Sequence, residues 1–516
     1  MSTRNNVRRL VDGFETGGNT MIERYADKTI TEMWTDREKV RRWQKTELAV
    51  IKAREKAGII PKGTYWTITD SLLQAGPCDI TWWKEREDVL RHDLNAWLEE
   101  RMRFIPSEFQ QYFHQGLTSY DTEEPAFALM LDASTGHIIT LAEKLLSALH
   151  EKALKFRCTP MNGRTHGQEA ELQSFGKRCL TWFQDLQWTE ATLNQIRTSD
   201  LKVSKLSGAM GSYSGLSPEL EQAALAEMKL EPFYGATQIM PRILYAPLAS
   251  ALADIATVLD KIATDIRLGA RSGRPLWHEP FGKKQKGSSA MPHKKNTIST
   301  EKVEGMARMA RSYAAGIKEN IKTWEERAIE QSSIERVFWP DLFHVVAHAL
   351  VTMTKVITGL VVYPDNMMRE IIDSRGTYAS NEAKEFLVKH GSPVGIGRED
   401  AYRIVQLASF NAFWRGRHEP PANFKESDTL FQKFNDDARQ TYNPRRGDSI
   451  EIIISNAALQ YSDELDAMPD VIDEWKKKLM NLFIPNERLK KDWHALFLPS
   501  HALKREAFLF TEVFGA

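Results

Sequence analysis

Apolar side chains recur along the middle of the chain with the spacing of a long α-helix. Between residues 248 and 266 they follow one another in alternating steps of four and three, and charged residues occupy the other faces. The apolar positions are Leu248, Leu252, Ile255, Leu259, Ile262 and Ile266. A narrow apolar stripe of this kind is typical of long helices that pack lengthwise against other helices. The pattern therefore predicts a helix bundle.

Two further segments have the same spacing. One runs from residue 138 to about 153, and the other runs from 342 to 360, where Gly359 and Pro364 favour a helix end. Their apolar positions are Ile138, Leu141, Leu145 and Leu149 in the first and Leu342, Val345, Ala349, Met353, Val356 and Leu360 in the second. The alternation that predicts β-strands is scarce and short. We therefore expect an all-α protein with a central long-helix bundle.

These patterns divide the 516 residues into three expected helical domains. Residues 1–125 contain shorter helical segments that are interrupted by the Gly-Pro-Cys-Asp sequence at 76–79. Residues 126–366 contain the three apolar stripes, and we expect the bundle there. Residues 367–516, which include prolines and charges clustered around 417–447, are expected to form a smaller helical domain.

The composition is that of a water-soluble globular protein. Hydrophobic residues make up 42% of the chain, and 69 basic residues balance 69 acidic ones. Proteins that coat nucleic acid or bind membrane surfaces usually carry excess positive charge, so neither class is expected. The cysteines, Cys78, Cys158 and Cys179, have no paired short spacing, which favours a reducing cytoplasm over a disulfide framework or a zinc site. We expect neither a secretory signal nor a membrane span.

The most distinctive segment, from Pro280 to Glu301, reads PFGKKQKGSSAMPHKKNTISTE. Its glycines, lysines and paired serines predict a mobile, cationic loop at about 280–300. A solvated loop between two helices is the usual meaning of such a composition. However, the run Gly-Ser-Ser-x-Met-Pro-x-Lys-x-Asn resembles the signature loop of the fumarase, aspartase and argininosuccinate lyase superfamily.

Other segments resemble one branch of that superfamily, the adenylosuccinate lyase family. In order along the chain they are Arg-Tyr at 24–25, Arg-His-Asp at 91–93, Thr-Ser at 118–119, Gly-Arg-Thr-His-Gly at 163–167, Ala-Thr-Gln at 236–238 and the charged run 325–336. The resemblance implies a homotetramer with a core of packed bundles and active sites shared between subunits. It also implies a small-molecule substrate, a succinyl-amino nucleotide, and neither a metal nor an organic cofactor.

The reaction of this superfamily removes a weakly acidic proton beside a carboxylate while a bond on the neighbouring carbon breaks. Catalysis therefore needs a base, an acid for the leaving amine, and donors for the charge that develops on the carboxylate. By resemblance Ser288 is the base and His166 is the acid. Glu301 would orient His166, His92 would assist, and Lys294 would help to hold the carboxylate.

The resemblance also implies a set of substrate-binding residues. Arginine suits phosphate because its planar group donates two parallel hydrogen bonds. The expected phosphate ligands are Arg24, Tyr25, Arg327, Ser332 and Arg336. Thr118, Ser119 and Gln238 are expected to contact the succinyl carboxylates or their neighbour, and Asn296 and the backbone of Ser289 would help to hold the reacting carboxylate. Arg91, Asp93 and Met291 are further expected substrate-binding residues. A solvated, salt-bridged helix face is the alternative meaning of the charges between 325 and 336.

The resemblance implies elimination of fumarate from adenylosuccinate to give AMP. It implies the same reaction on the succinyl-aminoimidazole carboxamide nucleotide of purine biosynthesis. Lys295-Asn296-Thr297 departs from the usual Arg-Asn-Pro, and an acid and a histidine usual in bacterial relatives are missing after Arg327. Two alternatives therefore stay open, a sister lyase that acts on argininosuccinate or aspartate and a catalytically silent structural relative. The joint presence of His166 and Ser288 favours an active enzyme.

Overall fold

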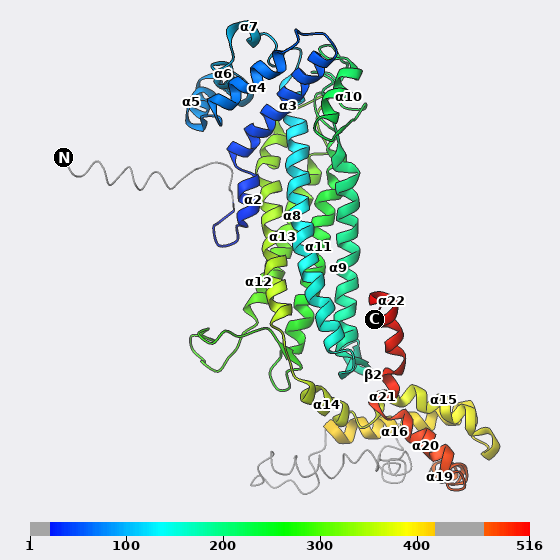
Figure 1. Cartoon of the computed structure of the whole chain (residues 1–516). Helices are drawn as coiled ribbons and strands as arrows, with labels where there is room; N and C mark the ends of the chain where they lie inside the picture. The colour runs from blue at the N-terminus through cyan, green and yellow to red at the C-terminus, as the bar shows by residue number, and fades with distance from the viewer. Residues whose placement is uncertain (1–20, 418–468, 516) are drawn as a thin grey trace. The chain divides into compact units, whose positions relative to one another are not determined.

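The structure is a computed structural model that describes residues 21–417 and 469–515. Helices dominate this part of the chain, which confirms the all-α prediction (Figure 1). Its helices are α2 (Lys28–Met33), α3 (Asp36–Lys56), α4 (Thr64–Ala75), α5 (Ile80–Leu90), α6 (Asp93–Met102), α7 (Ser107–Gln110), α8 (Ser119–Lys155), α9 (Phe175–Thr198), α10 (Pro218–Ala226), α11 (Ala246–Gly269), α12 (Ile298–Glu319), α13 (Glu330–Thr358), α14 (Pro364–Asp373), α15 (Ser380–His390), α16 (Arg398–Arg417), α19 (Pro469–Phe483), α20 (Glu487–Leu496), α21 (Pro499–Ala502) and α22 (Glu506–Phe514).

The strands of the described residues are short and form two-stranded pairs. They are β1 (Pro160–Thr165), β2 (Gln168–Ser174), β3 (Val203–Ser204), β4 (Glu231–Pro232), β5 (Trp277–His278) and β6 (Val361–Val362). β1 pairs with β2 and β5 with β6 in antiparallel fashion, whereas β3 and β4 are parallel. These pairs connect helices, and no larger sheet is present among the described residues.

The long helices α8, α9, α11, α12 and α13 run side by side (Figure 1). Ion pairs join neighbouring helices: Arg197 on α9 binds Asp132 on α8 at 3.2 Å, and Arg311 on α12 binds Asp260 on α11 at 3.0 Å. The six apolar positions of the stripe between 248 and 266 are fully buried, and the other two predicted stripes are buried as well. The seven-residue spacing thus identifies the core-facing side of each helix.

Two of the helical segments are long and apolar enough, by length and composition, to cross a membrane. They are Arg242–Gly269 and Glu330–Thr358. The sequence led us to expect no apolar segment of this length, and on length and composition alone that expectation is wrong. More than half of each apolar window is buried inside the protein, at 56% and 67%. Burial of this extent is also found in core helices of soluble proteins, and the bundle gives these apolar faces helical partners.

Contacts group the described residues into two compact units. The first contains those of Met1–Ala148, Gln184–Arg267 and Phe281–Gly359, and the second contains those of Leu149–Phe183, Leu268–Pro280 and Leu360–Ala516. Each unit combines segments that are distant in sequence. The division into three consecutive domains stays a prediction.

The first unit has a satellite core among its N-terminal helices. Trp43 packs edge-to-face against Trp83 and Trp97, with ring centroids 5.9 and 5.7 Å apart. All three rings are fully buried or nearly so. Gly76–Asp79, the predicted interruption, lies between α4 and α5.

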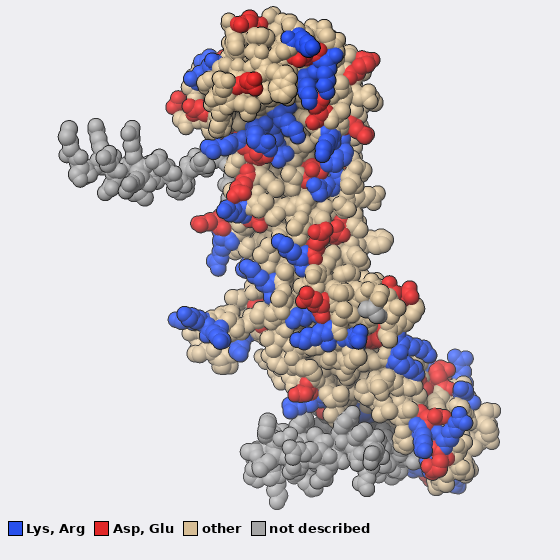
Figure 2. All heavy atoms as spheres, in the orientation of Figure 1, with Lys and Arg blue, Asp and Glu red and all other residues tan. Residues whose placement is uncertain are grey.

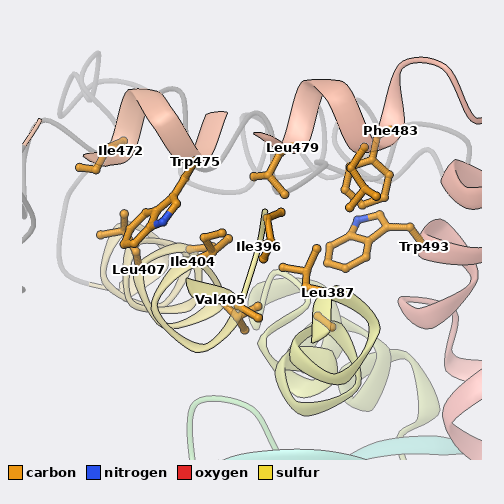
Figure 3. Packing of buried hydrophobic residues seen from close by; sticks show 14 of the residues in the cluster. Leu387, Ile396, Ile404, Val405, Leu407, Ile472, Trp475, Leu479, Phe483 and Trp493 are labelled. Atoms are coloured by element: carbon orange, nitrogen blue, oxygen red, sulfur yellow. The ribbon is translucent and has the colours of Figure 1, made fainter. Parts of the chain in front are cut away.

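The second unit has its own core, in which α15 and α16 pack against α19 and α20 (Figure 3). Leu387, Ile404 and Leu479 meet there, and Trp475 fixes one edge by donating its indole N–H to Asp400 at 3.1 Å. This core joins segments on either side of residues 418–468. Most of the predicted cluster around 417–447 lies outside the described residues.

Candidate active site

The predicted catalytic loop lies between β5 and α12 and has no helix or strand from residue 279 to 297. Its residues from Phe281 onward belong to the first unit. The exposed basic side chains of the loop are Lys283, Lys284, Lys286, Lys294 and Lys295. Figure 2 shows basic side chains where Figure 1 draws this loop, whereas basic and acidic groups are interspersed over the rest of the visible face. The loop is therefore a local concentration of positive charge on a chain with no net charge.

Ser288 organises a tight turn inside this loop. Its Oγ accepts a hydrogen bond from the Met291 N–H at 3.3 Å, and its own N–H donates to the Lys294 carbonyl at 3.2 Å. The side chains of Ser289, Met291 and Lys294 are exposed, and Asn296 is half-buried. This turn thus holds the predicted base and its expected helpers on one short segment.

Glu301 lies in the first turn of α12, where a negative charge is favoured by the helix dipole. Its carboxylate is 3.6 Å from Arg267 on α11. This residue was expected to orient His166, and that role stays a prediction.

His166 lies at the tip of the β1–β2 hairpin, in the second unit. His166 and Gly167 form the two-residue turn, with φ of 53° and 77°. Positive φ at both positions is the requirement of a type I′ turn, which matches the twist of a hairpin. The imidazole is exposed. The predicted acid and the predicted base, Ser288, therefore belong to different units.

His92 and Ser119 lie together in the first unit. His92 caps the N-terminus of α6, where its Nδ1 accepts from the Asn95 N–H at 3.3 Å. An accepting Nδ1 places the proton of a neutral ring on Nε2. Nε2 lies 3.4 Å from the Oγ of Ser119, the first residue of α8. Arg91 precedes this cap with a left-handed backbone, φ 54°, and its side chain is exposed.

A cavity of about 310 Å³ lies in the first unit, and Asp93, Ser332 and Arg336 line it. Arg336 donates to the Asp93 carboxylate at 2.8 Å. Burial alone would raise the pKa of Asp93, but the positive charges of Lys39 and Arg336 outweigh burial and hold it below its ordinary value. Asp93 is thus kept ionised and orients one of the predicted phosphate ligands.

Gln238 and Arg327 also meet. The Arg327 Nη1 donates to Gln238 Oε1 at 2.8 Å, and the guanidinium lies 4.2 Å from the ring centre of Tyr120. The Gln238 amide nitrogen donates to the Ala209 carbonyl at 3.3 Å. Two predicted substrate contacts from distant segments are therefore joined.

A buried ion pair contacts the backbone of Gln238. Lys205 Nζ contacts the Asp121 carboxylate at 2.7 Å, and both side chains are completely buried. The other two bonds of the ammonium go to the carbonyls of Gly208, at 2.8 Å, and Gln238, at 3.0 Å. Asp121 in turn accepts from the N–H of Thr118 at 2.9 Å. This pair therefore ties the Thr118 segment to the Gln238 segment.

The remaining predicted phosphate ligands lie at the start of the described chain. The ring of Tyr25 packs edge-on against His348 of α13, with centroids 5.2 Å apart, while Arg24 is exposed. Asp27 donates its N–H to His344 Nδ1 at 3.0 Å, which holds this segment on α13. Neither Arg24 nor Tyr25 lines the described cavity.

Comparison with known proteins identifies the family of this chain. A sequence model of the family described as Lyase matches residues 18–311, more than half of the chain. The chain is 35% identical over 398 residues to the curated adenylosuccinate lyase of Thermotoga maritima, which covers 77% of the chain and 90% of the relative. It is 36% identical over 393 residues to that of Synechocystis sp., covering 76% and 89%. The chain belongs to the adenylosuccinate lyase family.

Solved structures agree on the fold of this lyase. Fumarate lyase from Mesorhizobium sp. BNC1 superimposes with a TM-score of 0.67 at 21% identity, covering 94% of the chain and all of the other protein. The 3-carboxy-cis,cis-muconate lactonizing enzyme from Pseudomonas putida gives 0.71 at 19% identity, covering 96% and 98%. At these identities the likeness concerns the fold alone.

Sequence reasoning missed several groups around the site of this lyase. Lys39 and Glu123 line the cavity beside Arg336, and Asp121 and Lys205 form the buried pair. Asp121 lies two residues after the Thr-Ser segment at 118–119, and this position was the one sign in the sequence of a role at the site. Nothing in the sequence shows that Asp121 is buried. Among the described residues, no group of three or more His, Cys, Asp and Glu side chains is placed to hold a metal ion.

Proposed function

We propose that this lyase eliminates fumarate from adenylosuccinate to give AMP, and from the succinyl-aminoimidazole carboxamide nucleotide of purine biosynthesis. It is a carbon–nitrogen lyase. The observation that carries the proposal is the match to curated adenylosuccinate lyases over about nine-tenths of their length. We further propose a cytoplasmic homotetramer whose active sites combine residues of several subunits.

In the proposed mechanism Ser288 removes the proton from the carbon next to a succinyl carboxylate. The electron pair of that C–H bond forms the double bond of fumarate, and the neighbouring C–N bond breaks. His166 gives its proton to the leaving nitrogen, with Glu301 as its orienting carboxylate. Lys294 and Asn296 stabilise the charge that develops on the carboxylate.

A serine hydroxyl is a weak base, so the loop must surround it with donors before it reacts. The exposed lysines and the turn at Ser288 support this role, because they concentrate positive charge and backbone N–H groups on one segment. We propose that the loop closes over the bound substrate.

We propose that the nucleotide phosphate is bound by Arg24, Tyr25, Arg327, Ser332 and Arg336. Support comes from the cavity beside Ser332 and Arg336 and from Asp93, which orients the Arg336 guanidinium. Thr118, Ser119 and Gln238 are proposed to contact the succinyl group. His92 would act beside Ser119, and Arg91, Ser289 and Met291 complete the proposed set.

The decisive experiment measures fumarate release by the purified full chain from adenylosuccinate, argininosuccinate and aspartate. Ser288→Ala is the test variant. Ser312→Ala is the matched control, because Ser312 lies on α12, outside the loop. Release from adenylosuccinate alone, abolished by Ser288→Ala and retained by Ser312→Ala, is the expected result. Release only from another compound would overturn the nucleotide assignment, and full activity of Ser288→Ala would overturn the base assignment.

A further inference from the structure

One carboxyl group in the cavity has no hydrogen-bond partner among the residues that the structure describes. It belongs to Glu123, which lines the cavity together with Ser332 and Arg336. Glu123 lies on α8 four residues after Ser119, so the two side chains leave the same face of the helix. Glu123 is half-buried, and its carboxyl, which is bound to no described protein group in the cavity, is open to a ligand there.

The surroundings of Glu123 disfavour its charged form. Burial, and then the negative charge of Asp93, raise its pKa to about 8, against the opposing charges of Lys39, Arg336 and Arg327. The other ionisable groups that line the cavity are Asp36 and Lys84 beside Lys39, Tyr120 and Glu124 on its own helix, and Arg242 and Glu335. Near neutral pH the carboxyl is mostly protonated, and it can then both donate and accept a hydrogen bond.

Charge balance is consistent with a protonated Glu123 facing an anion. Apart from Glu123, the lining contains four basic and four acidic side chains. An ionised Glu123 would leave an excess of negative charge next to the proposed phosphate ligands. A neutral one leaves Ser332 and Arg336 able to bind phosphate without a repelling neighbour.

The chemistry of a nucleotide then limits what Glu123 can contact. The phosphate is excluded, since it is an anion that Arg336 and Ser332 are placed to receive. The base suits the aromatic and apolar walls of the cavity, which are Trp34, Trp43, Phe127 and Met130. The sugar lies between phosphate and base, and its hydroxyl groups both donate and accept, as a protonated carboxyl does.

We propose that Glu123 binds a ribose hydroxyl of the nucleotide, so that the cavity selects ribonucleotide over deoxyribonucleotide substrates. This inference rests on the proposed function. Glu123 is then a specificity-determining residue that touches substrate but takes no part in proton transfer.

The test is calorimetric binding of AMP, 2′-deoxy-AMP and 3′-deoxy-AMP to the full chain. We expect the wild type to bind AMP about tenfold more tightly than at least one deoxynucleotide, the value of one good hydrogen bond. Glu123→Val should abolish that preference. Glu123→Gln, which keeps both donor and acceptor, should retain it at pH 7. Glu190→Gln is the matched control, because burial also raises the pKa of Glu190 and it does not line the cavity.

A pH series gives a second readout. If the protonated form binds, AMP affinity should fall about tenfold between pH 7 and 9 in the wild type and stay nearly constant in Glu123→Gln. The phosphate itself changes little across this range, since its second pKa is about 6 and it is already mostly doubly ionised at pH 7. An equal fall in both proteins would overturn the inference.

The outcomes separate this inference from the function on which it rests. A wild type that releases no fumarate from adenylosuccinate and binds none of the three nucleotides overturns both. A wild type that is active, but whose nucleotide preference survives in Glu123→Val, overturns the role of Glu123 alone. Equal weakening of all three nucleotides in that variant would also overturn it, because a general disturbance of the cavity has no preference for a hydroxyl.

Discussion

Lys205→Met should be among the most damaging single substitutions in the first unit. The ammonium donates to the Asp121 carboxylate and to the carbonyls of Gly208 and Gln238, which accounts for all three of its protons. Methionine has a similar length but leaves a buried carboxylate without its counter-ion. Removing one partner of a buried ion pair costs about 3–5 kcal/mol, because the other charge remains desolvated.

The magnitude can be checked by urea unfolding at one protein concentration, since the stability of the proposed tetramer would depend on concentration. The matched control is Arg311→Met, which breaks an ion pair with Asp260 whose arginine side chain is 40% exposed. An exposed pair of this kind contributes at most about 1 kcal/mol. Lys205→Met combined with Asp121→Asn should recover part of the loss, because the unpaired charge is removed. A Lys205→Met protein as stable as the Arg311→Met control would refute the reasoning.

Three other substitutions test separate parts of the structure. Arg336→Ala should weaken AMP binding at least tenfold in calorimetry, as loss of a charge-assisted phosphate contact predicts; unchanged affinity would remove Arg336 from the proposed site. Burial lowers the pKa of His344 from 6.5 to about 4, so between these pH values the unfolded chain binds a proton that the folded protein does not. The contribution of His344 to the free energy of unfolding is therefore complete above pH 6.5 and is lost as pH falls towards 4. In His344→Asn the free energy of unfolding, measured with urea, should fall less steeply between pH 6.5 and 4 than in the wild type. An equal fall in both proteins would contradict this prediction. Trp43→Ala should cost about 3–5 kcal/mol in the same assay through the cavity it leaves, and a loss below 1 kcal/mol would show that Trp83 and Trp97 repack.

The bundle was predictable because its signal is local. In α11 the spacing of Leu248, Leu252 and Ile255 alone identifies the buried face, since the helical period relates sequence position to direction. The stripe on α13 is informative for the same reason, and Gly359, which was expected to favour a helix end, directly follows the last residue of α13. The helical spacing of apolar residues and the residues that favour a helix end were sufficient for this prediction, and both can be read from a single sequence.

The hairpin that carries His166 shows where such reasoning loses resolution. Its strands have six and seven residues, and their side chains do not alternate cleanly between polar and apolar. The turn type depends on positive φ at His166 and Gly167, for which the His-Gly dipeptide was the only sign. Resemblance identified the histidine, and the structure supplied the element that presents it.

The buried charges could not be predicted from the sequence at all. Lys205 reads as one lysine among many, and its pairing with Asp121 depends on a contact between α8 and a segment far along the chain. Arg242 is a similar case: it binds Glu335 at 2.7 Å and Glu124 at 2.5 Å, which lie on two different helices. Periodicity reports which face of a helix is buried, but it does not report which charges are buried together.

These buried ion pairs contact, or are next in sequence to, the proposed binding residues. Asp121 holds the segment of Thr118, Lys205 holds that of Gln238, and Glu335 precedes Arg336 on α13. The proposed base and acid, in contrast, lie on turns whose side chains are half-buried or exposed. Binding geometry is thus fixed by the folded core, whereas the groups that move protons are set on segments that can adjust as substrate binds. Conservative changes in the buried pairs should therefore raise KM and lower stability together, while changes at the two turns should lower kcat without a change in stability. A turn variant that loses stability as much as a buried-pair variant would show that the turns are themselves part of the core.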